Sequence, residues 1–115
     1  LDTAATHDSY NGLQTECTTA ASSLGADGNT CLADAALKRA LATTKTWTNG
    51  TGGTDTEIVL AKTFTSGTTA SITESGLFNS TTIGSGGMLS HKTFAAVSLT
   101  DGDSITVTWT FTVGN

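Results

Sequence analysis

The final segment of the chain, residues 104–113, constrains the fold most strongly, because two sets of side chains alternate along it. One set is large and apolar and the other is threonine: Ile105, Val107, Trp109, Phe111 and Val113 against Thr106, Thr108, Thr110 and Thr112. A period of two predicts a β-strand with one buried and one solvent-facing side. A slip of one residue would expose Trp109 and Phe111, so the pairing of this strand must be closely specified.

The composition extends this expectation to the rest of the chain. The sequence has 26 Thr, 14 Ala, 13 Gly and 11 Ser, against 4 Phe, 2 Trp and 1 Tyr. Such short and often β-branched side chains favour strands. Apolar alternation and turn residues predict further strands at 43–48, 57–65, 72–79 and 88–99.

The sequence also predicts the shape of one of these strands and the pairing of two others. Residues 72–79 should form two short strands or one bent strand, because Gly76 suggests a bulge or a close backbone approach. The turn residues 100–103 (Thr-Asp-Gly-Asp) predict that 88–99 and 104–113 form a hairpin.

The N-terminal part has a different pattern. Leu37 and Leu41, four residues apart among alanines, predict one short helix over 32–43, capped by Thr30. Residues 1–28 show no sustained period and are expected to form an N-terminal arm and a long loop, with a short strand near 7–13.

A chain of 115 residues has room for a single core. We therefore expect a mainly β protein: one antiparallel β-sandwich, jelly-roll-like, over 29–115, with one short helix and the arm 1–28. The aromatic residues expected to anchor the core are Trp47, Phe64, Phe78, Phe94, Trp109 and Phe111.

The charge balance excludes some classes of partner. The formal net charge is -5 and the pI is about 4.6. Nucleic acids and anionic membranes are therefore not expected as partners, because the attraction that dominates binding to phosphates is missing. No apolar run approaches the roughly 18 residues that a membrane-spanning helix needs.

Cys17 and Cys31 are the two cysteines of the chain. Neither has the spacing of a zinc site, and a disulfide between them is the natural interpretation, with two buried free thiols as the alternative. Closing a loop of this length would constrain the unfolded chain by about 3 kcal/mol in the loop-entropy model.

Candidates for chemistry are few. His91 in a predicted strand and His7 near the arm are weak catalytic candidates, and no Gly-x-Ser-x-Gly turn occurs. Glu74 is interpreted as a carboxylate near a turn that accepts backbone hydrogen bonds. Asp101 and Asp103 fit a turn better than a weak Ca²⁺ site. We expect no catalytic residue, no metal site and no cofactor, whereas Asn49 and Asn79 begin Asn-x-Thr acceptors for glycosylation in predicted loops.

Four stretches of the C-terminal half carry a resemblance to known proteins. They are ITESGLFN at 72–79, GGMLS at 86–90, TFAAV at 93–97 and DGDSITVTWT at 101–110. This series resembles small proteins from the structural-gene clusters of tailed bacteriophages and archaeal tailed viruses, in which I-T-E-x-G-L-F-N, G-G-x-M-L and a closing T-W-T recur in this order. The middle motif is one residue shorter here, and the N-terminal third departs from the pattern. The resemblance implies a virion or tail-associated structural role without catalytic residues.

The expected function is that of a non-enzymatic virion protein, either a capsid decoration (cement) subunit or a tail component. Its partners would be copies of itself, as a homo-oligomer, and other virion proteins. The alternative is a secreted subunit of an extracellular surface filament assembled by strand addition, which the expected disulfide and the glycosylation acceptors fit. A carbohydrate-binding module using Trp47 and Trp109 ranks lower, because Trp109 lies on the face expected to be buried.

Overall fold

The computed structural model describes residues 34–53, 55–82 and 85–114. A three-residue 3-10 helix precedes five strands, and every pair of neighbouring strands is antiparallel. The elements are η1 (Ala35–Leu37), β1 (Thr44–Thr48), β2 (Thr56–Thr65), β3 (Ala70–Phe78), β4 (Met88–Leu99) and β5 (Ser104–Val113). The mainly β class is confirmed. The expected arm 1–28 and the Cys17–Cys31 disulfide lie outside the described residues.

The strands form where the sequence predicts them, to within two residues at every end. Residues 72–78 belong to one strand, β3, and its register against β4 shifts between Ile72 and Glu74 and again between Leu77 and Phe78. Gly76 pairs regularly with His91 between these two shifts. The irregularity expected at Gly76 therefore lies on either side of it.

The helix predicted over 32–43 is wrong for its described part, where only Ala35–Leu37 are helical. Lys38 is extended, with φ -73° and ψ -176°, and Thr43 N donates to Ala61 O at 2.9 Å, which starts β1. A helix would place Leu37 and Leu41 on one face, but Leu37 is fully buried while Leu41 is 70% exposed. Burial of Leu37 and the pairing of β1 override the helical preference of the alanine-rich segment.

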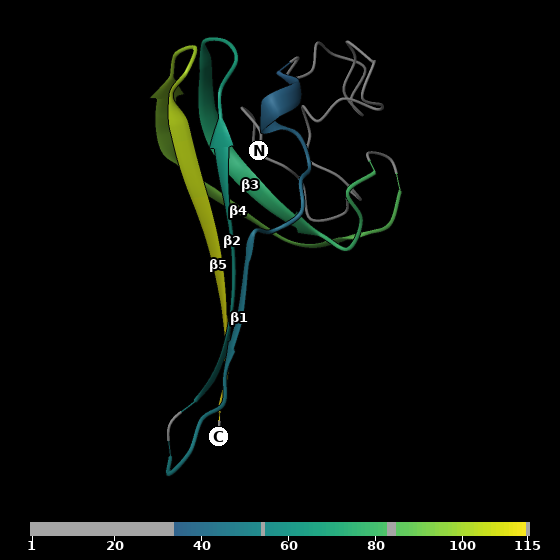
Figure 1. The fold of residues 1–115 in the computed structure, drawn as a ribbon, viewed down its shortest axis with the longest axis vertical. Helices are drawn as coiled ribbons and strands as arrows, with labels where there is room; N and C mark the ends of the chain where they lie inside the picture. Colours follow the sequence, from purple (N-terminus) through teal and green to yellow (C-terminus); the bar gives the residue numbers. More distant parts are fainter. Residues whose placement is uncertain (1–33, 54, 83–84, 115) are drawn as a thin grey trace.

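The five strands form two sheets, one of order β1-β2-β5 and one of β3-β4 (Figure 1). The hairpin predicted between 88–99 and 104–113 is wrong, because β4 pairs with β3 and β5 pairs with β2. The turn at 100–103 is present, with Gly102 at a positive φ of 89° and Asp103 N donating to Thr100 O at 3.0 Å. It carries the chain from one sheet to the other.

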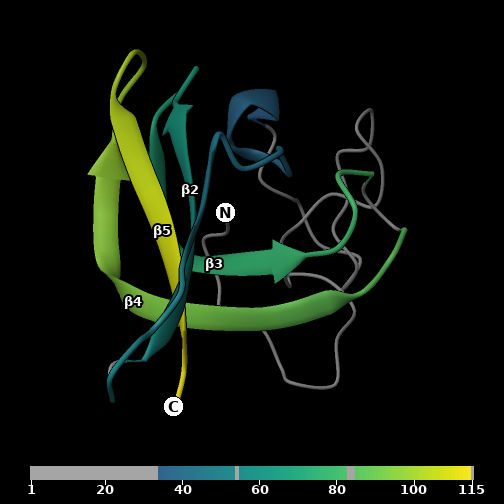
Figure 2. The ribbon, with the colours of Figure 1, turned by 60° about the horizontal axis from the view of Figure 1, so that its bottom comes forward.

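The two sheets are halves of one long antiparallel ribbon. The pair Thr65↔Ser104 ends one half and Ala70↔Leu99 begins the next, with four residues between them on each strand. Across this corner Ser66 N donates to Asp103 O at 2.7 Å and Gly102 N donates to Ser66 O at 2.8 Å. The register therefore continues through the corner, beyond which β3 and β4 run across β2 and β5 (Figure 2).

The core lies at this corner, between the two sheets. Three hydrophobic side chains are fully or nearly fully buried, and four more pack against them: Leu37, Ile72 and Leu99, then Phe64, Ala70, Phe94 and Ile105. Among the expected anchors, Phe64 and Phe94 contact this core, Phe78 and Trp109 are half-buried, and Phe111 is 37% exposed.

Trp47 does not act as a core anchor in this structure, because its side chain is 68% exposed. It lies on β1, at the edge of its sheet, and pairs with Ile58. Ile58 is far along β2 from the corner, so the core does not reach this end of the sheet.

Candidate functional site

One side of the three-stranded sheet is apolar along its whole length. Directly paired residues point to the same side of a sheet, and the register places Trp47, Ile58 and Phe111 in one row and Lys45, Leu60 and Trp109 in the next. We call this side the apolar face. Its members are mostly apolar: Lys45 and Trp47 on β1, Thr56, Ile58, Leu60, Lys62 and Phe64 on β2, and Ile105, Val107, Trp109, Phe111 and Val113 on β5.

The other side of the same sheet is polar, and we call it the threonine face. It consists of Thr44, Thr46, Thr48, Glu57, Val59, Ala61, Thr63, Thr65, Ser104, Thr106, Thr108, Thr110 and Thr112. Hydroxyls of paired residues interact on it: those of Thr63 and Thr106 lie 2.8 Å apart, and those of Thr65 and Ser104 lie 3.0 Å apart.

Burial decreases along the apolar face, away from the corner. Phe64 and Ile105 contact the core at one end, whereas Val113 is 57% exposed at the other. The Trp109 and Phe111 rings stack with centroids 6.5 Å apart and 15° between their planes. Large apolar side chains are therefore open to solvent at the end of the sheet that carries Trp47.

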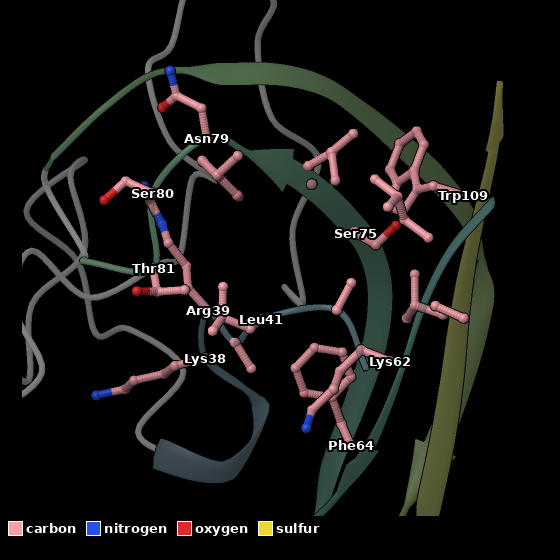
Figure 3. A pocket seen from close by; sticks show the side chains of 18 of the residues that line it. Lys38, Arg39, Leu41, Lys62, Phe64, Ser75, Asn79, Ser80, Thr81 and Trp109 are labelled. Atoms are coloured by element: carbon pink, nitrogen blue, oxygen red, sulfur yellow. The ribbon is translucent and has the colours of Figure 1, made fainter. Parts of the chain in front are cut away.

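A pocket of about 480 Å³ lies on the middle of the apolar face (Figure 3). Its floor consists of apolar side chains of β2 and β5, namely Leu60, Phe64, Val107 and Trp109. Its walls are the end of β3, residues 75–78, the following residues 79–81, and the extended segment 38–42. The pocket forms where the β3–β4 half of the ribbon diverges from the sheet beneath it.

The charge of the pocket is strongly asymmetric. Lys38, Arg39, Lys45 and Lys62 line it, which is four of the five Lys and Arg residues of the chain, and no Asp or Glu is among its lining residues. The fifth cation, Lys92, lies on β4 outside the pocket. Among residues 34–53, 55–82 and 85–114, positive charge is thus gathered at one apolar cavity, which favours an occupant with negative charge. We call it the basic pocket.

Arg39 also has a structural role in the wall of this pocket. Its guanidinium carbon lies 3.7 Å from the centroid of the Phe78 ring, and its Nη1 donates to Thr82 O at 3.3 Å and to Ser85 O at 3.1 Å. These contacts hold the tip of the β3–β4 hairpin against segment 38–42. Within the tip, Gly87 N donates to Asn79 Oδ1 at 2.8 Å.

Glu74 and His91 face each other between β3 and β4. Glu74 is fully buried in a strand, so its interpretation as a carboxylate near a turn is wrong. His91 Nδ1 lies 3.0 Å from Glu74 Oε1, an ion-pair distance that lacks the direction of a hydrogen bond. The His91 side chain is 21% exposed. This pair joins two strands, and the second histidine, His7, lies outside the described residues.

Two other carboxylates hold the turns at the corner. Asp34 Oδ1 accepts from Ala36 N at 2.9 Å, and its Oδ2 accepts from Gly67 N at 2.7 Å and from the Ser66 hydroxyl at 3.1 Å. Burial raises the pKa of Asp34, but these hydrogen bonds outweigh it and hold the pKa below its usual value.

Asp103 belongs to its turn, as the sequence indicates. Its Oδ2 accepts from Thr100 N at 2.8 Å and from the Thr100 hydroxyl at 2.9 Å, and these bonds lower the pKa of Asp103. In residues 34–53, 55–82 and 85–114 no group of three or more His, Cys, Asp or Glu side chains could hold a metal ion. No helix in this same part of the chain is long and apolar enough to cross a membrane. Asn49 and Asn79 are exposed.

Comparisons of the chain with protein-family models, with curated proteins and with solved structures give no match. The basic pocket is the feature that sequence patterns alone did not indicate. Its four cations belong to the segment after η1, to β1 and to β2, so no short motif contains them. A signal was nevertheless present, because all Lys and Arg residues but one lie within 38–62, across the predicted helix and the first two strands predicted after it.

Proposed function

We propose that this chain is a non-enzymatic structural subunit of a tailed-virus particle, either a capsid decoration protein or a tail-associated protein. It would act through symmetric contacts with its own copies and with other virion proteins. The observation that carries the proposal is the uncovered end of the apolar face, where Trp47 is 68% and Val113 57% exposed. Large exposed apolar side chains next to one another are typical of protein interfaces, and aromatic residues dominate their energetics.

The size of the core supports the same proposal. Among the described residues, three hydrophobic side chains are fully or nearly fully buried. A small domain with few such residues has limited stability of its own. Neighbouring subunits in a closed assembly would add burial to the small core that the described residues form.

The residues that carry the resemblance to virion proteins have structural tasks in this fold. Ile72 is at the centre of the core, Glu74 faces His91, Phe78 lies beneath Arg39, and Asn79 holds the hairpin tip. A motif whose members build a hairpin is what a structural protein would retain. The proposal includes the finer fold, a single antiparallel, jelly-roll-like β-sandwich over 29–115 with an arm over 1–28. The folded ribbon, with its core between two sheets, supports the sandwich.

Light scattering of the purified chain at several concentrations tests this function. A discrete closed oligomer is expected, and Trp47→Ser should weaken it while the chain stays folded by circular dichroism. Leu89→Ser is the matched control, because Leu89 is 66% exposed but lies on β4, away from the apolar face. Mass spectrometry of purified particles of the virus that encodes the chain should detect it. A monomer at all concentrations, or absence of the chain from the particles, would refute the proposal.

A second candidate is a secreted filament subunit assembled by strand addition. Within the described residues β4, the longest strand with 12 residues, pairs on one side alone, with β3. An open strand edge is a template for a strand from another chain. In the same light-scattering experiment, mass that grows without limit as the concentration rises would favour the filament over the closed oligomer.

A further inference from the structure

We infer that the basic pocket is a docking site for residues 1–28 of a second copy of the chain. The inference rests on the proposed function, since it says how neighbouring subunits are joined. It assigns the pocket a ligand class, an acidic peptide segment with apolar side chains, and a source for it.

The lining of the pocket defines the chemistry of its occupant. Leu60, Phe64 and Trp109 offer an apolar floor, while Lys45 and Lys62 extend from the same face of the sheet. Lys62 runs beside Phe64 in Figure 3, with its amino group at the edge of the cavity. An occupant that satisfies both features must bury apolar side chains and bring carboxylates to the lysines. Nucleic acid is disfavoured as the occupant, because the net charge of -5 of the chain opposes the approach of a polyanion.

The sequence of the chain contains a segment of this kind. Residues 1–28 carry four carboxylates, Asp2, Asp8, Glu16 and Asp27, and no Lys or Arg. They account for four of the five units of net negative charge of the chain. Tyr10, Leu13 and Leu24 supply the apolar side chains, spaced among the acids. Four of the five Lys and Arg residues of the chain line the pocket, so the pocket and residues 1–28 are complementary in charge.

The position of the pocket favours a second copy as the source of the segment. The pocket is continuous with the exposed end of the apolar face, because Lys45, Leu60 and Trp109 are next to the row of Trp47, Ile58 and Phe111. A neighbour that covers Trp47 and Phe111 therefore lies at the mouth of the pocket. Each copy would donate one segment and accept one, which is compatible with the closed oligomer of the proposed function.

Charge reversal on the full chain tests the inference. Lys45→Glu with Lys62→Glu reverses the charge of the two pocket lysines that extend from the sheet, without touching Arg39, which holds the hairpin tip. Asp2→Lys, Asp8→Lys and Glu16→Lys reverse the segment. Each variant alone should associate at least ten-fold more weakly by light scattering. An equimolar mixture of the two should recover association, because each pocket then meets a complementary segment on the other chain.

Lys92, on β4, provides the control for the pocket lysines. Lys92→Glu makes the same charge change as Lys45→Glu on an exposed strand lysine outside the pocket, and it should leave association unchanged. If Lys92→Glu and Lys45→Glu, each made alone, weakened association equally, the inference would be overturned, since net charge alone would then explain the effect. Association could also recover in a single chain that carries both sets of substitutions and not in the mixture. That result would overturn the second copy as the source of the segment and identify the chain's own residues 1–28 as the occupant.

Cross-linking gives a readout that does not depend on association strength. A zero-length carbodiimide joins lysine amines to carboxylates, and a mixture of ¹⁴N and ¹⁵N chains marks which copy each peptide comes from. Mixed-isotope links from Lys45 or Lys62 to residues 1–28 are expected. Links within one isotope alone, or no links to 1–28, would contradict the inference. If the chain is present in purified particles while these results are negative, the docking site is refuted and the proposed function stands.

Discussion

Asp34 offers a sharp test of how the corner of the ribbon is held. It lies at the start of η1 and is nearly buried, and its two carboxylate oxygens accept three hydrogen bonds. Two of the three donors, Ser66 and Gly67, begin the connection from β2 to β3. The same Ser66 is bonded to Asp103 and Gly102 through its backbone. Removing the carboxylate should therefore loosen η1 and the corner together.

The size of the effect follows from these contacts. A hydrogen bond to a charged group contributes about 1.5–3 kcal/mol net. The three bonds share one carboxylate, and water can reach the exposed Ala36 and Gly67, so their contributions do not add in full. We expect Asp34→Ala to lower the free energy of unfolding by about 2–4 kcal/mol.

Asp34→Asn should lower it less, by about 1–2 kcal/mol. The single amide oxygen can still accept from Ala36 N. The amide nitrogen can donate to the Ser66 hydroxyl, which keeps its own acceptor in Thr68 O at 2.6 Å. Gly67 N alone then lacks a partner. Asp101→Asn is the control, because it removes the same charge from an exposed turn residue and should change stability by less than about 0.5 kcal/mol.

Urea unfolding at pH 7 and near pH 3 completes the test. The pKa of Asp34 is lowered in the folded chain, so its contribution is present above its ordinary value of 3.8 and is lost as the pH falls through the folded-state pKa. The difference between the native chain and Asp34→Asn should shrink at the lower pH. The lowered pKa of Asp103 acts in the same direction in both chains and cancels in the difference. A difference that is independent of pH, or an alanine variant as stable as the native chain, would refute this reasoning.

Four further substitutions test other parts of the structure. Ile72→Ala, at a fully buried position, should destabilise the chain by about 2–5 kcal/mol in urea unfolding, whereas Trp47→Ala should change stability by less than about 0.5 kcal/mol under monomeric conditions. Gly86→Ala should destabilise the chain by about 1–2 kcal/mol and so lower its melting temperature, because Gly86 has a φ of 69° and an added Cβ would meet the Asn79 side chain. An unchanged melting temperature would contradict this. Arg39→Lys keeps the charge but cannot stack on a ring and reach two carbonyls at once, so hydrogen exchange at Asn79 N in the hairpin tip should become faster, and unaltered exchange would argue against the clamp.

The strands could be predicted because their signal is local. In β5 the alternation of apolar residues with threonine is complete, and the structure places the two sets on opposite sides of one sheet. The helix over 32–43 fails for the opposite reason. Its local signal is alanine propensity, which is worth a few tenths of a kcal/mol per residue, less than the burial of one leucine such as Leu37.

Strand pairing was not available from local patterns. The turn at 100–103 has the composition of a hairpin turn, yet β4 and β5 pair with other strands. The turn instead forms hydrogen bonds with Ser66, which lies far away in the sequence, so no local pattern contains this contact. The burial of Glu74 has the same origin, because its neighbour His91 lies on another strand.

The two sides of the β1-β2-β5 sheet together restrict how a subunit of this kind can associate. On the threonine face, hydroxyls pair with one another, as those of Thr63 and Thr106 do, and exposed hydroxyls are also well hydrated, so covering that face gains little. On the apolar face, by contrast, Trp47 and Val113 lose unfavourable contact with water when a neighbour covers them. A contact between subunits is therefore expected on the apolar side, next to the basic pocket, with the threonine face left toward solvent. One register, set by the alternation in β5, thus places the core residues Phe64 and Ile105 and the exposed Trp47 on the same side, where the proposed contact between subunits is expected.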